Sequence, residues 1–274
     1  MQSSDQKAAW AKEKDEHWAK EKAAMKNDDG NLNEEKAAWL AKMKKEKEHT
    51  LMDPGLPCTD DCQARHARTD ASAMAQIHRG RTLKILCLHG GNGNASAFKH
   101  ELAQLDSQLG ALAEFIYAEA PRQTSATGKC WFGKAPEDAD AYWVDSVRHL
   151  QDVIATQGPF DGVLGYSMGA SGAFHLLAAV PEDTFKFAVV ACGYSSAHGP
   201  EIARQLESRC PLRTPTLICM GRNDPTIPNE MSLGCLQHFA PGVAELSKHP
   251  GGHHVPADPI HVNHLAAFLL RFAT

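Results

Sequence analysis

The chain has 274 residues, a length that one α/β domain with an appendage can fill. Its apolar fraction of 43% and charged fraction of 22% are typical of a globular protein with a buried core, and no apolar run approaches the roughly 20 residues that a membrane helix needs. The formal net charge of -5, without a cluster of lysine and arginine, excludes an obvious nucleic-acid partner. We therefore expect neither a membrane span nor nucleic-acid binding.

The first fifty residues form a charged segment rich in Ala, Lys and Glu, with equal numbers of acidic and basic residues. The segment has neither the apolar block of a secretory signal nor the acid-poor bias of a transit peptide, which predicts a cytoplasmic protein. Its composition favours two helices interrupted at residues 27–31, and hence a charged helical hairpin over residues 1–50. Trp10, Trp18 and Trp39 give an apolar stripe too narrow for a core of its own. We expect solvated helices, with docking of a partner protein as the alternative.

Residues 51–80 are richer in Pro, Gly, Asp and Cys and have no periodicity, which predicts a linker. Within it, Cys58, Cys62 and His66 form a C-x3-C-x3-H pattern that a helix would place on one face. A structural zinc site normally has four ligands, and no fourth is evident nearby. We therefore predict two reduced thiols and no bound metal.

From residue 81 onward, short apolar runs alternate with helical patterns. Runs that predict buried parallel strands lie at 83–88, 114–117, 162–165, 187–192 and 216–220. Helical patterns lie near 95–109, 139–157, 168–179, 200–207, 230–239 and 259–272. The alternation predicts one α/β domain over residues 81–274, with a mostly parallel, doubly wound sheet and functional groups in the loops after its strands.

Gly165-Tyr166-Ser167-Met168-Gly169 is a G-x-S-x-G sequence directly after a predicted strand and before a predicted helix. This placement is typical of a nucleophile elbow, a sharp turn that projects the serine hydroxyl. Glycine on both sides permits the close packing of the turn, and we expect Gly172 to do the same one turn further on. The alternative is an ordinary strand-to-helix turn.

A nucleophilic serine requires a base and a carboxylate that orients the base, and in this kind of sheet they follow the serine in chain order. Asp224 comes directly after the predicted strand at 216–220, although an Asp-Pro turn would look the same. His253 follows in a glycine-containing loop. His254 is a direct competitor for the role of base, and His249 is a weaker one.

The glycine-rich loop at residues 88–94 could supply donors for a developing oxyanion. We expect the backbone N–H groups of Gly91 and Met168 to be that pair. A dinucleotide site is disfavoured because the third glycine of G-x-G-x-x-G is replaced by Ser96.

Together these segments resemble the FSH serine hydrolases of the α/β-hydrolase superfamily, which include the ovarian-cancer-associated-gene-2-like proteins. The resemblance covers roughly residues 82–272. The residues that carry it are Leu86 to Gly91 with Asn94, Trp131-Phe132, Gly158 to Ala170, Gly221 with Asp224 and Pro228, and Gly251-Gly252-His253.

The resemblance implies an α/β-hydrolase fold that cleaves carboxylic esters or thioesters of small molecules without a cofactor. It implies Ser167 as nucleophile, Asp224 as orienting acid and His253, preceded by two glycines, as base. The family often has Gln where this chain has Gly93 and Met168, a departure that concerns substrate preference rather than these roles.

Trp131 and Phe132 lie in the long segment between the second and third predicted strands. We expect them to form a wall of the acyl pocket, with a role as core anchors as the alternative. For the whole chain, two other functions stay open. One is a non-catalytic binding protein on a hydrolase scaffold, and the other is a docking module formed by the N-terminal hairpin.

Overall fold

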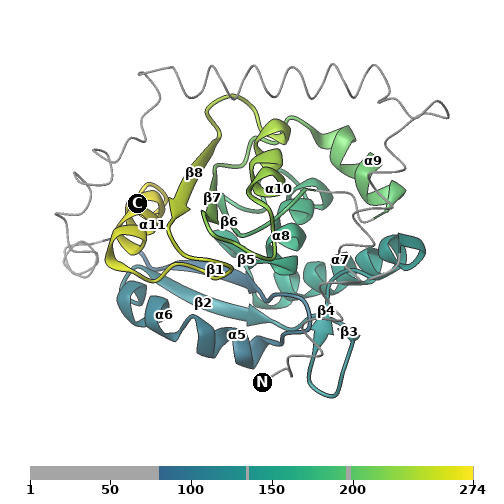
Figure 1. The fold of residues 1–274 in the computed structure, drawn as a ribbon, viewed down its shortest axis with the longest axis horizontal. Coiled ribbons are helices and arrows are strands. Elements are labelled where there is room, and N and C mark those ends of the chain that lie inside the picture. The colour runs from purple at the N-terminus through teal and green to yellow at the C-terminus, as the bar shows by residue number, and fades with distance from the viewer. Residues whose placement is uncertain (1–79, 134–135, 196–198, 274) are drawn as a thin grey trace. The chain divides into compact units, whose positions relative to one another are not determined.

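The computed structural model describes residues 80–133, 136–195 and 199–273 (Figure 1). The predicted hairpin at 1–50, the linker up to residue 79 and its Cys58-Cys62-His66 pattern lie outside the described residues, and they stay predictions. Across the described ranges, no helix combines the length and the apolar character that crossing a membrane requires.

A parallel sheet of six strands in the order β2-β1-β5-β6-β7-β8 lies at the centre of the fold (Figure 1). The strands are β1 (Leu83–Leu88), β2 (Ala113–Ala118), β5 (Gly162–Tyr166), β6 (Phe187–Ala191), β7 (Thr216–Gly221) and β8 (Ala244–His249). The predicted doubly wound sheet is confirmed. Strand order reverses between β1 and β5, and in such sheets ligands bind outside the carboxyl ends of the strands at this point.

Helices cover both faces of the sheet. One face packs against α7 (Pro136–Gln157), α8 (Met168–Ala179) and α9 (Pro200–Arg209). The other packs against α5 (Ala95–Glu101), α6 (Ala103–Leu109) and α11 (Pro259–Leu270). The short helices α10 (Asn229–Gly234) and η1 (Cys235–His238) precede β8. A small antiparallel pair, β3 (Arg122–Gln123) and β4 (Lys129–Cys130), lies apart from the main sheet.

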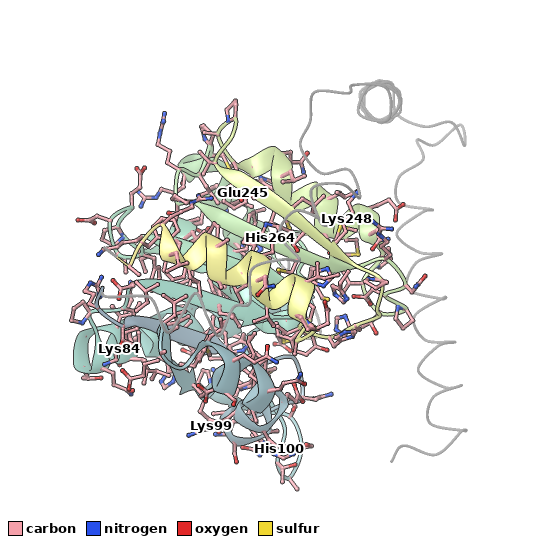
Figure 2. The ribbon with its side chains drawn as sticks, turned by 90° about the vertical axis from the view of Figure 1, so that its left-hand side faces the viewer. Lys84, Lys99, His100, Glu245, Lys248 and His264 are labelled. Carbon is pink, nitrogen blue, oxygen red and sulfur yellow. The ribbon has the colours of Figure 1, made fainter. Side chains whose placement is uncertain are left out.

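Successive side chains of each strand point to opposite faces of the sheet, so each face has its own hydrophobic core. In β1, Leu86 and Leu88 join the core under α7 and α8, whereas Ile85 and Cys87 join the core under α5 and α11. Strands that are buried on both faces have continuous apolar sequences, and this is the pattern from which such strands were predicted. Figure 2 shows α11 lying over the sheet, where Nδ1 of His264 is 3.1 Å from the Ser247 hydroxyl of β8.

Two elements differ from the sequence prediction. The helix expected over residues 95–109 is divided at Leu102 into α5 and α6. Strand β8 is absent from the five apolar runs because it is a polar edge strand, with only Ser247 and His249 buried. An edge strand faces solvent along one side and has no need of a continuous apolar run.

Glycines at the start of α8 allow strand and helix to approach closely. A Cβ added to Gly165 would lie 2.1 Å from the Gly169 carbonyl oxygen, and one added to Gly169 would lie 2.2 Å from the Leu88 carbonyl oxygen. Both contacts are with backbone atoms, which cannot shift without a loss of stability. The same expectation for Gly172 is wrong, because a Cβ there meets no atom nearer than 3.7 Å.

We therefore predict opposite effects for two Gly-to-Ala substitutions on one helix. Gly169→Ala should lower the free energy of unfolding by about 3 kcal/mol because the backbone must shift. Gly172→Ala should leave it unchanged or raise it by up to about 1 kcal/mol, since alanine is the better helix former. Chemical denaturation of both variants measures the difference, and equal losses would contradict this account of the turn.

Candidate active site

Ser167 lies at the junction of β5 and α8 in a backbone conformation that few residues adopt. Its φ of 55° and ψ of -120° differ from those of both the strand and the helix it joins. Its N–H donates to the Ala191 carbonyl at the end of β6, at 2.9 Å, which ties the turn to the next strand. Backbone strain of this kind persists only where the surroundings over-determine it, and it concentrates at functional sites.

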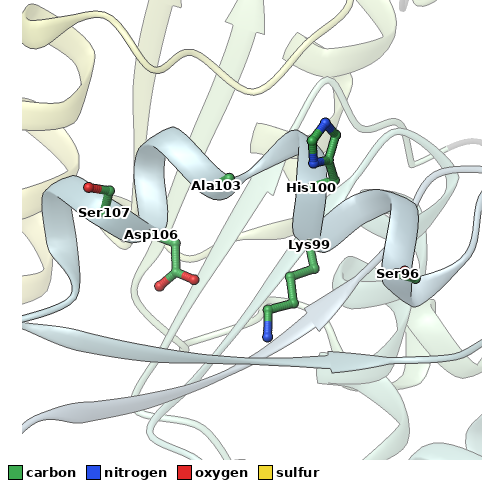
Figure 3. A pocket seen from close by; sticks show the side chains of 6 residues that line it. All are labelled: Ser96, Lys99, His100, Ala103, Asp106 and Ser107. Carbon is green, nitrogen blue, oxygen red and sulfur yellow. The ribbon is translucent and has the colours of Figure 1, made fainter.

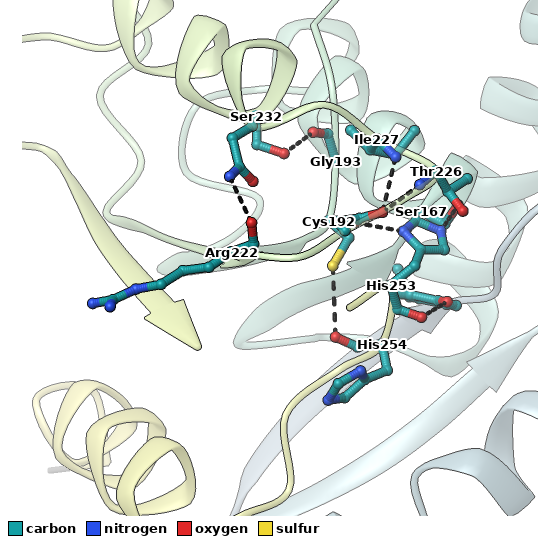
Figure 4. Close-up of polar contacts among 12 residues, drawn as sticks. Ser167, Cys192, Gly193, Arg222, Thr226, Ile227, Ser232, His253 and His254 are labelled. Atoms are coloured by element: carbon teal, nitrogen blue, oxygen red, sulfur yellow. Dashed lines mark hydrogen bonds and ion pairs between the residues drawn. The ribbon is translucent and has the colours of Figure 1, made fainter. Parts of the chain in front are cut away.

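The His253 ring contacts Ser167 (Figure 4) and also contacts Asp224. Its Nε2 lies 2.8 Å from the Ser167 hydroxyl oxygen, and its Nδ1 lies 2.7 Å from Oδ2 of Asp224. The three residues come from loops after β5, β7 and β8, so the fold brings together groups that are far apart in the chain. The neighbouring His254 ring instead packs against His249, with ring centroids 4.7 Å apart. The geometry thus favours His253 over His254 and His249 as the candidate base.

Asp224 is held as a charged, immobile acceptor. Its Oδ1 accepts hydrogen bonds from the N–H groups of Thr226 and Ile227 at 2.8 and 2.9 Å, which leaves Oδ2 for His253. Burial alone would raise the pKa of this carboxyl, but the hydrogen bonds from His253, Ile227 and Thr226 outweigh it and hold the pKa below its usual value. The turn predicted as the alternative is also present, and it is what fixes the carboxylate.

The loops that carry Asp224 and His253 are bonded to each other. The Asn223 N–H donates to the Gly251 carbonyl at 3.1 Å, and the Asn223 side chain donates to the Pro250 carbonyl at 2.7 Å. A Cβ on Gly221 would lie 2.2 Å from the Gly252 carbonyl oxygen, so the absence of a side chain there permits the approach. Asp224 and His253 are therefore positioned as one unit.

The glycine-rich loop after β1 lies against the serine turn. A Cβ on Gly91 would lie 3.0 Å from Cε and 3.4 Å from Cβ of Met168, so the two residues are in contact distance. The Met168 N–H belongs to the first turn of α8, where backbone donors have no partner within the helix. The fold thus brings the two residues predicted to supply the oxyanion donors into contact.

The His89 ring stabilises this loop by hydrogen bonds from both of its nitrogens, and these bonds require one particular tautomer. The Ala120 N–H donates to its Nε2 at 3.1 Å, so Nδ1 carries the proton and donates to the Gly90 carbonyl at 2.8 Å. Burial lowers the pKa of the ring, which favours this neutral form. The Trp131 indole N–H donates to the His89 carbonyl at 2.9 Å. This supporting role of His89 was not predicted from the sequence.

Trp131 and Phe132 are both fully buried. They belong to the core on the α7 and α8 side, where Phe132 stacks on Trp143 with ring centroids 4.7 Å apart. This packing is that of core anchors, the alternative raised from the sequence. A role as the wall of an acyl pocket stays a prediction.

Two side chains next to the site were not predicted from the sequence. The Tyr166 hydroxyl donates to the His253 carbonyl at 2.8 Å, and its ring packs near the His253 ring at 5.1 Å. The Cys192 thiol donates to the His254 carbonyl at 3.5 Å (Figure 4). Both residues directly follow or end a strand beside the serine, which is the signal that could have identified them. They hold the backbone of the histidine loop.

A surface depression lies along α5 and α6 (Figure 3). It is lined by Ser96, Lys99, His100, Ala103, Asp106 and Ser107. None of these residues contacts the serine, the histidine or the aspartate just described.

Known proteins share this fold. The solved structure of SOBER1 from Arabidopsis thaliana is similar to it, with a TM-score of 0.53 at 17% identity, over 71% of this chain and 100% of that one. The solved structure of esterase PE8 is similar with a TM-score of 0.54 at 21% identity, over 70% of this chain and 94% of that one. The fold is that of the α/β hydrolases.

Sequence comparison narrows this class to one family. The family model for the FSH1 serine hydrolases matches residues 77–265, and the chain belongs to that family. Esterase OVCA2 of Danio rerio is 29% identical, over 69% of this chain and 97% of its own length. Esterase CG5412 of Drosophila melanogaster is 30% identical, over 64% of this chain and 69% of its own length.

We predict that Tyr166→Phe slows ester hydrolysis by roughly two- to tenfold in kcat, because a hydrogen bond worth about 1 kcal/mol to the His253 carbonyl is lost. KM should change little, since the hydroxyl holds the loop and not the substrate. Tyr117→Phe is the matched control, because the Tyr117 hydroxyl is buried without a hydrogen-bond partner. Steady-state kinetics on a p-nitrophenyl ester measure kcat and KM for both variants. Equal effects of the two substitutions would contradict the positioning role.

Proposed function

We propose that this protein hydrolyses a carboxylic ester or acyl thioester of a small molecule through an acyl-enzyme intermediate, with Ser167 as nucleophile. The observation that carries the proposal is the His253 ring, which lies within hydrogen-bond distance of Ser167 on one side and of Asp224 on the other. A serine hydroxyl is a poor nucleophile until a base accepts its proton in this way.

In the first half of the reaction, Ser167 Oγ attacks the substrate carbonyl carbon while His253 Nε2 accepts the hydroxyl proton. The negative charge of Asp224 then faces an imidazolium and stabilises it, and the same contact keeps Nε2 directed at the serine. Collapse of the tetrahedral intermediate passes the proton from His253 to the leaving alkoxide or thiolate. The acyl group is left on Ser167.

In the second half, water replaces the leaving group. His253 accepts a proton from water, the resulting hydroxide attacks the acyl carbonyl, and the proton returns to Ser167 Oγ as the acid leaves. The oxyanion of both intermediates would accept hydrogen bonds from the N–H groups of Gly91 and Met168. The contact between these two residues supports that role. No step needs a cofactor.

The esterase names of the relatives support hydrolysis over the rival function of a binding protein on an inactive scaffold. The hydrogen-bonded arrangement of Ser167, His253 and Asp224 also favours it, since a binding scaffold has no need of this geometry. Docking of a protein partner by the N-terminal hairpin concerns residues outside the described ranges. It stays a separate prediction.

Parallel assays of p-nitrophenyl esters and acyl-coenzyme A thioesters, from acetyl to palmitoyl, test the proposal and define the acyl group. Turnover of at least one series, together with labelling by a fluorophosphonate probe, is expected. Absence of both turnover and labelling in the folded protein would favour the binding-protein alternative.

Ser167→Ala should reduce kcat by a factor on the order of 10⁴ or more, because only substrate binding and oxyanion stabilisation remain. Probe labelling should disappear as well. Ser107→Ala on the exposed face of α6 is the control and should retain both. Near-normal turnover by folded Ser167→Ala would refute the proposed mechanism.

Substitution of the two adjacent histidines should have unequal effects. His253→Ala should lose about as much activity as Ser167→Ala, since groups that act as one unit are not additive. His254→Ala should lose far less, because its ring contacts His249 and not the serine. Asp224→Asn should cost a factor on the order of 10³ to 10⁴ by stabilising the wrong tautomer of His253. Hydrolysis rates of the three folded variants measure this order, and a larger loss in His254→Ala would reverse our assignment.

A further inference from the structure

Three potential metal ligands meet at the end of the sheet. Cys192 follows β6, Asp224 follows β7 and His253 follows β8, and one ligand atom of each lies within 4.8 Å of the other two (Figure 4). Asp224 and His253 belong to the proposed hydrolytic site. Cys192 has no role in that chemistry.

We propose that Cys192, Asp224 and His253 bind a thiophilic divalent cation, Zn²⁺ above all, and that the bound cation inhibits hydrolysis. The proposal rests on the proposed function, because it assigns regulation to the same histidine. A thiolate, a carboxylate and an imidazole are the protein ligands that zinc prefers, and three of them with a water molecule form a common coordination set.

The positions of the donor atoms require only small shifts. With zinc bonds of about 2.0 to 2.3 Å, ligand atoms in a tetrahedral site lie roughly 3 to 4 Å apart. Sγ of Cys192 starts within 4.8 Å of the other two donors, so it must move by no more than about an ångström or two. The contact of Nδ1 with Oδ2, at 2.7 Å, must open by a few tenths of an ångström. Rotation of the cysteine and histidine side chains supplies movements of this size.

The charges at the site also favour a cation. The Asp224 side chain is only 2% exposed. Its hydrogen-bond donors are two backbone N–H groups and the His253 ring, so while that ring is neutral no positive charge balances the carboxylate. A cation is held by the thiolate form of Cys192, so binding of Zn²⁺ displaces the thiol proton, which passes to solvent.

Binding would inhibit by changing the tautomer of His253. In the uninhibited site, Nδ1 carries a proton toward Asp224 and the Nε2 lone pair faces Ser167. A cation on Nδ1 takes the lone pair of that atom, so the proton of the neutral ring moves to Nε2. Nε2 then cannot accept the serine proton, and the nucleophile is not activated. The exposed edge of the His253 side chain, 15% accessible, gives the cation its route of entry.

Other cysteine and histidine pairs in the chain serve as matched controls. In the described part, Sγ of Cys210 lies 3.6 Å from Nδ1 of His238. In the sequence, Cys58, Cys62 and His66 have spacing that could hold a metal. Cys210→Ser and the double substitution Cys58→Ser/Cys62→Ser each remove one of these competing sites without touching Cys192.

The first experiment measures hydrolysis of a p-nitrophenyl ester by the full chain in metal-buffered solutions of Zn²⁺. We expect inhibition that a chelator reverses and that also blocks fluorophosphonate labelling. In Cys192→Ser, compared with its own zinc-free rate, the zinc concentration for half inhibition should rise at least tenfold. The two control variants should match the unsubstituted chain. An unchanged midpoint in Cys192→Ser, or loss of inhibition in a control, would overturn the proposal.

The second experiment reads binding without activity, so that failure of this inference differs from failure of the proposed function. Cd²⁺ bound to a thiolate gives an ultraviolet charge-transfer absorption. In the full chain with Cys58, Cys62 and Cys210 replaced by serine, a saturable absorption is expected, and it should vanish with Cys192→Ser and weaken at least tenfold in affinity with His253→Ala. Equal absorption with and without Cys192 would refute the site, whether or not the protein hydrolyses esters.

Discussion

The two hydrogen bonds of the His253 ring determine how the loops at the carboxyl end of the sheet must be arranged. Strands in a sheet are about 4.8 Å apart, so the ends of β8 and β5 are separated by roughly 14 Å. The histidine loop therefore has to cross back over the ends of β7 and β6 to meet Ser167. It can do so because Gly221 has no side chain to block the Gly252 carbonyl, and because Asn223 donates to the Pro250 and Gly251 carbonyls just before the crossing. Tyr166 then anchors the far end of the loop beside the serine.

The sequence predicted those parts of the fold that depend on one local pattern. Buried parallel strands such as β6 are apolar on both faces, and G-x-S-x-G between a strand and a helix predicted the turn at Ser167. Strand β8 is missing from the predicted apolar runs because its sequence is mostly polar and only Ser247 and His249 in it are buried. The prediction for Gly172 was wrong because a Cβ there would meet only side chains at ordinary contact distance, and sequence alone does not show which glycine lies against backbone.

The site was less predictable where residues far apart in the chain decide the outcome. His253 and His254 are adjacent and identical in type, so spacing alone left the base undecided without the resemblance to a family. In the structure, contacts separate them, since one ring meets Asp224 and the other meets His249. Cys192 closes an apolar run that predicts only a buried strand, and it is buried, but its φ of 52° after β6 turns it beside the aspartate. Trp131 is fully buried and donates to the His89 carbonyl, while its expected role at an acyl pocket stays a prediction.

Met168 joins the two halves of the site, one built by the histidine loop and the other by the loop after β1. Its backbone belongs to the serine turn, and its thioether lies against Gly91, so the two proposed oxyanion donors are kept together by one apolar side chain. A flexible, polarisable side chain fills such a gap without a hydrogen bond of its own. Glutamine, frequent at this position in the family, would bring an amide that needs partners in the same space. We therefore expect the departure at Met168 to affect which substrates fit, because the backbone N–H at that position is retained and Ser167, His253 and Asp224 keep their contacts with one another.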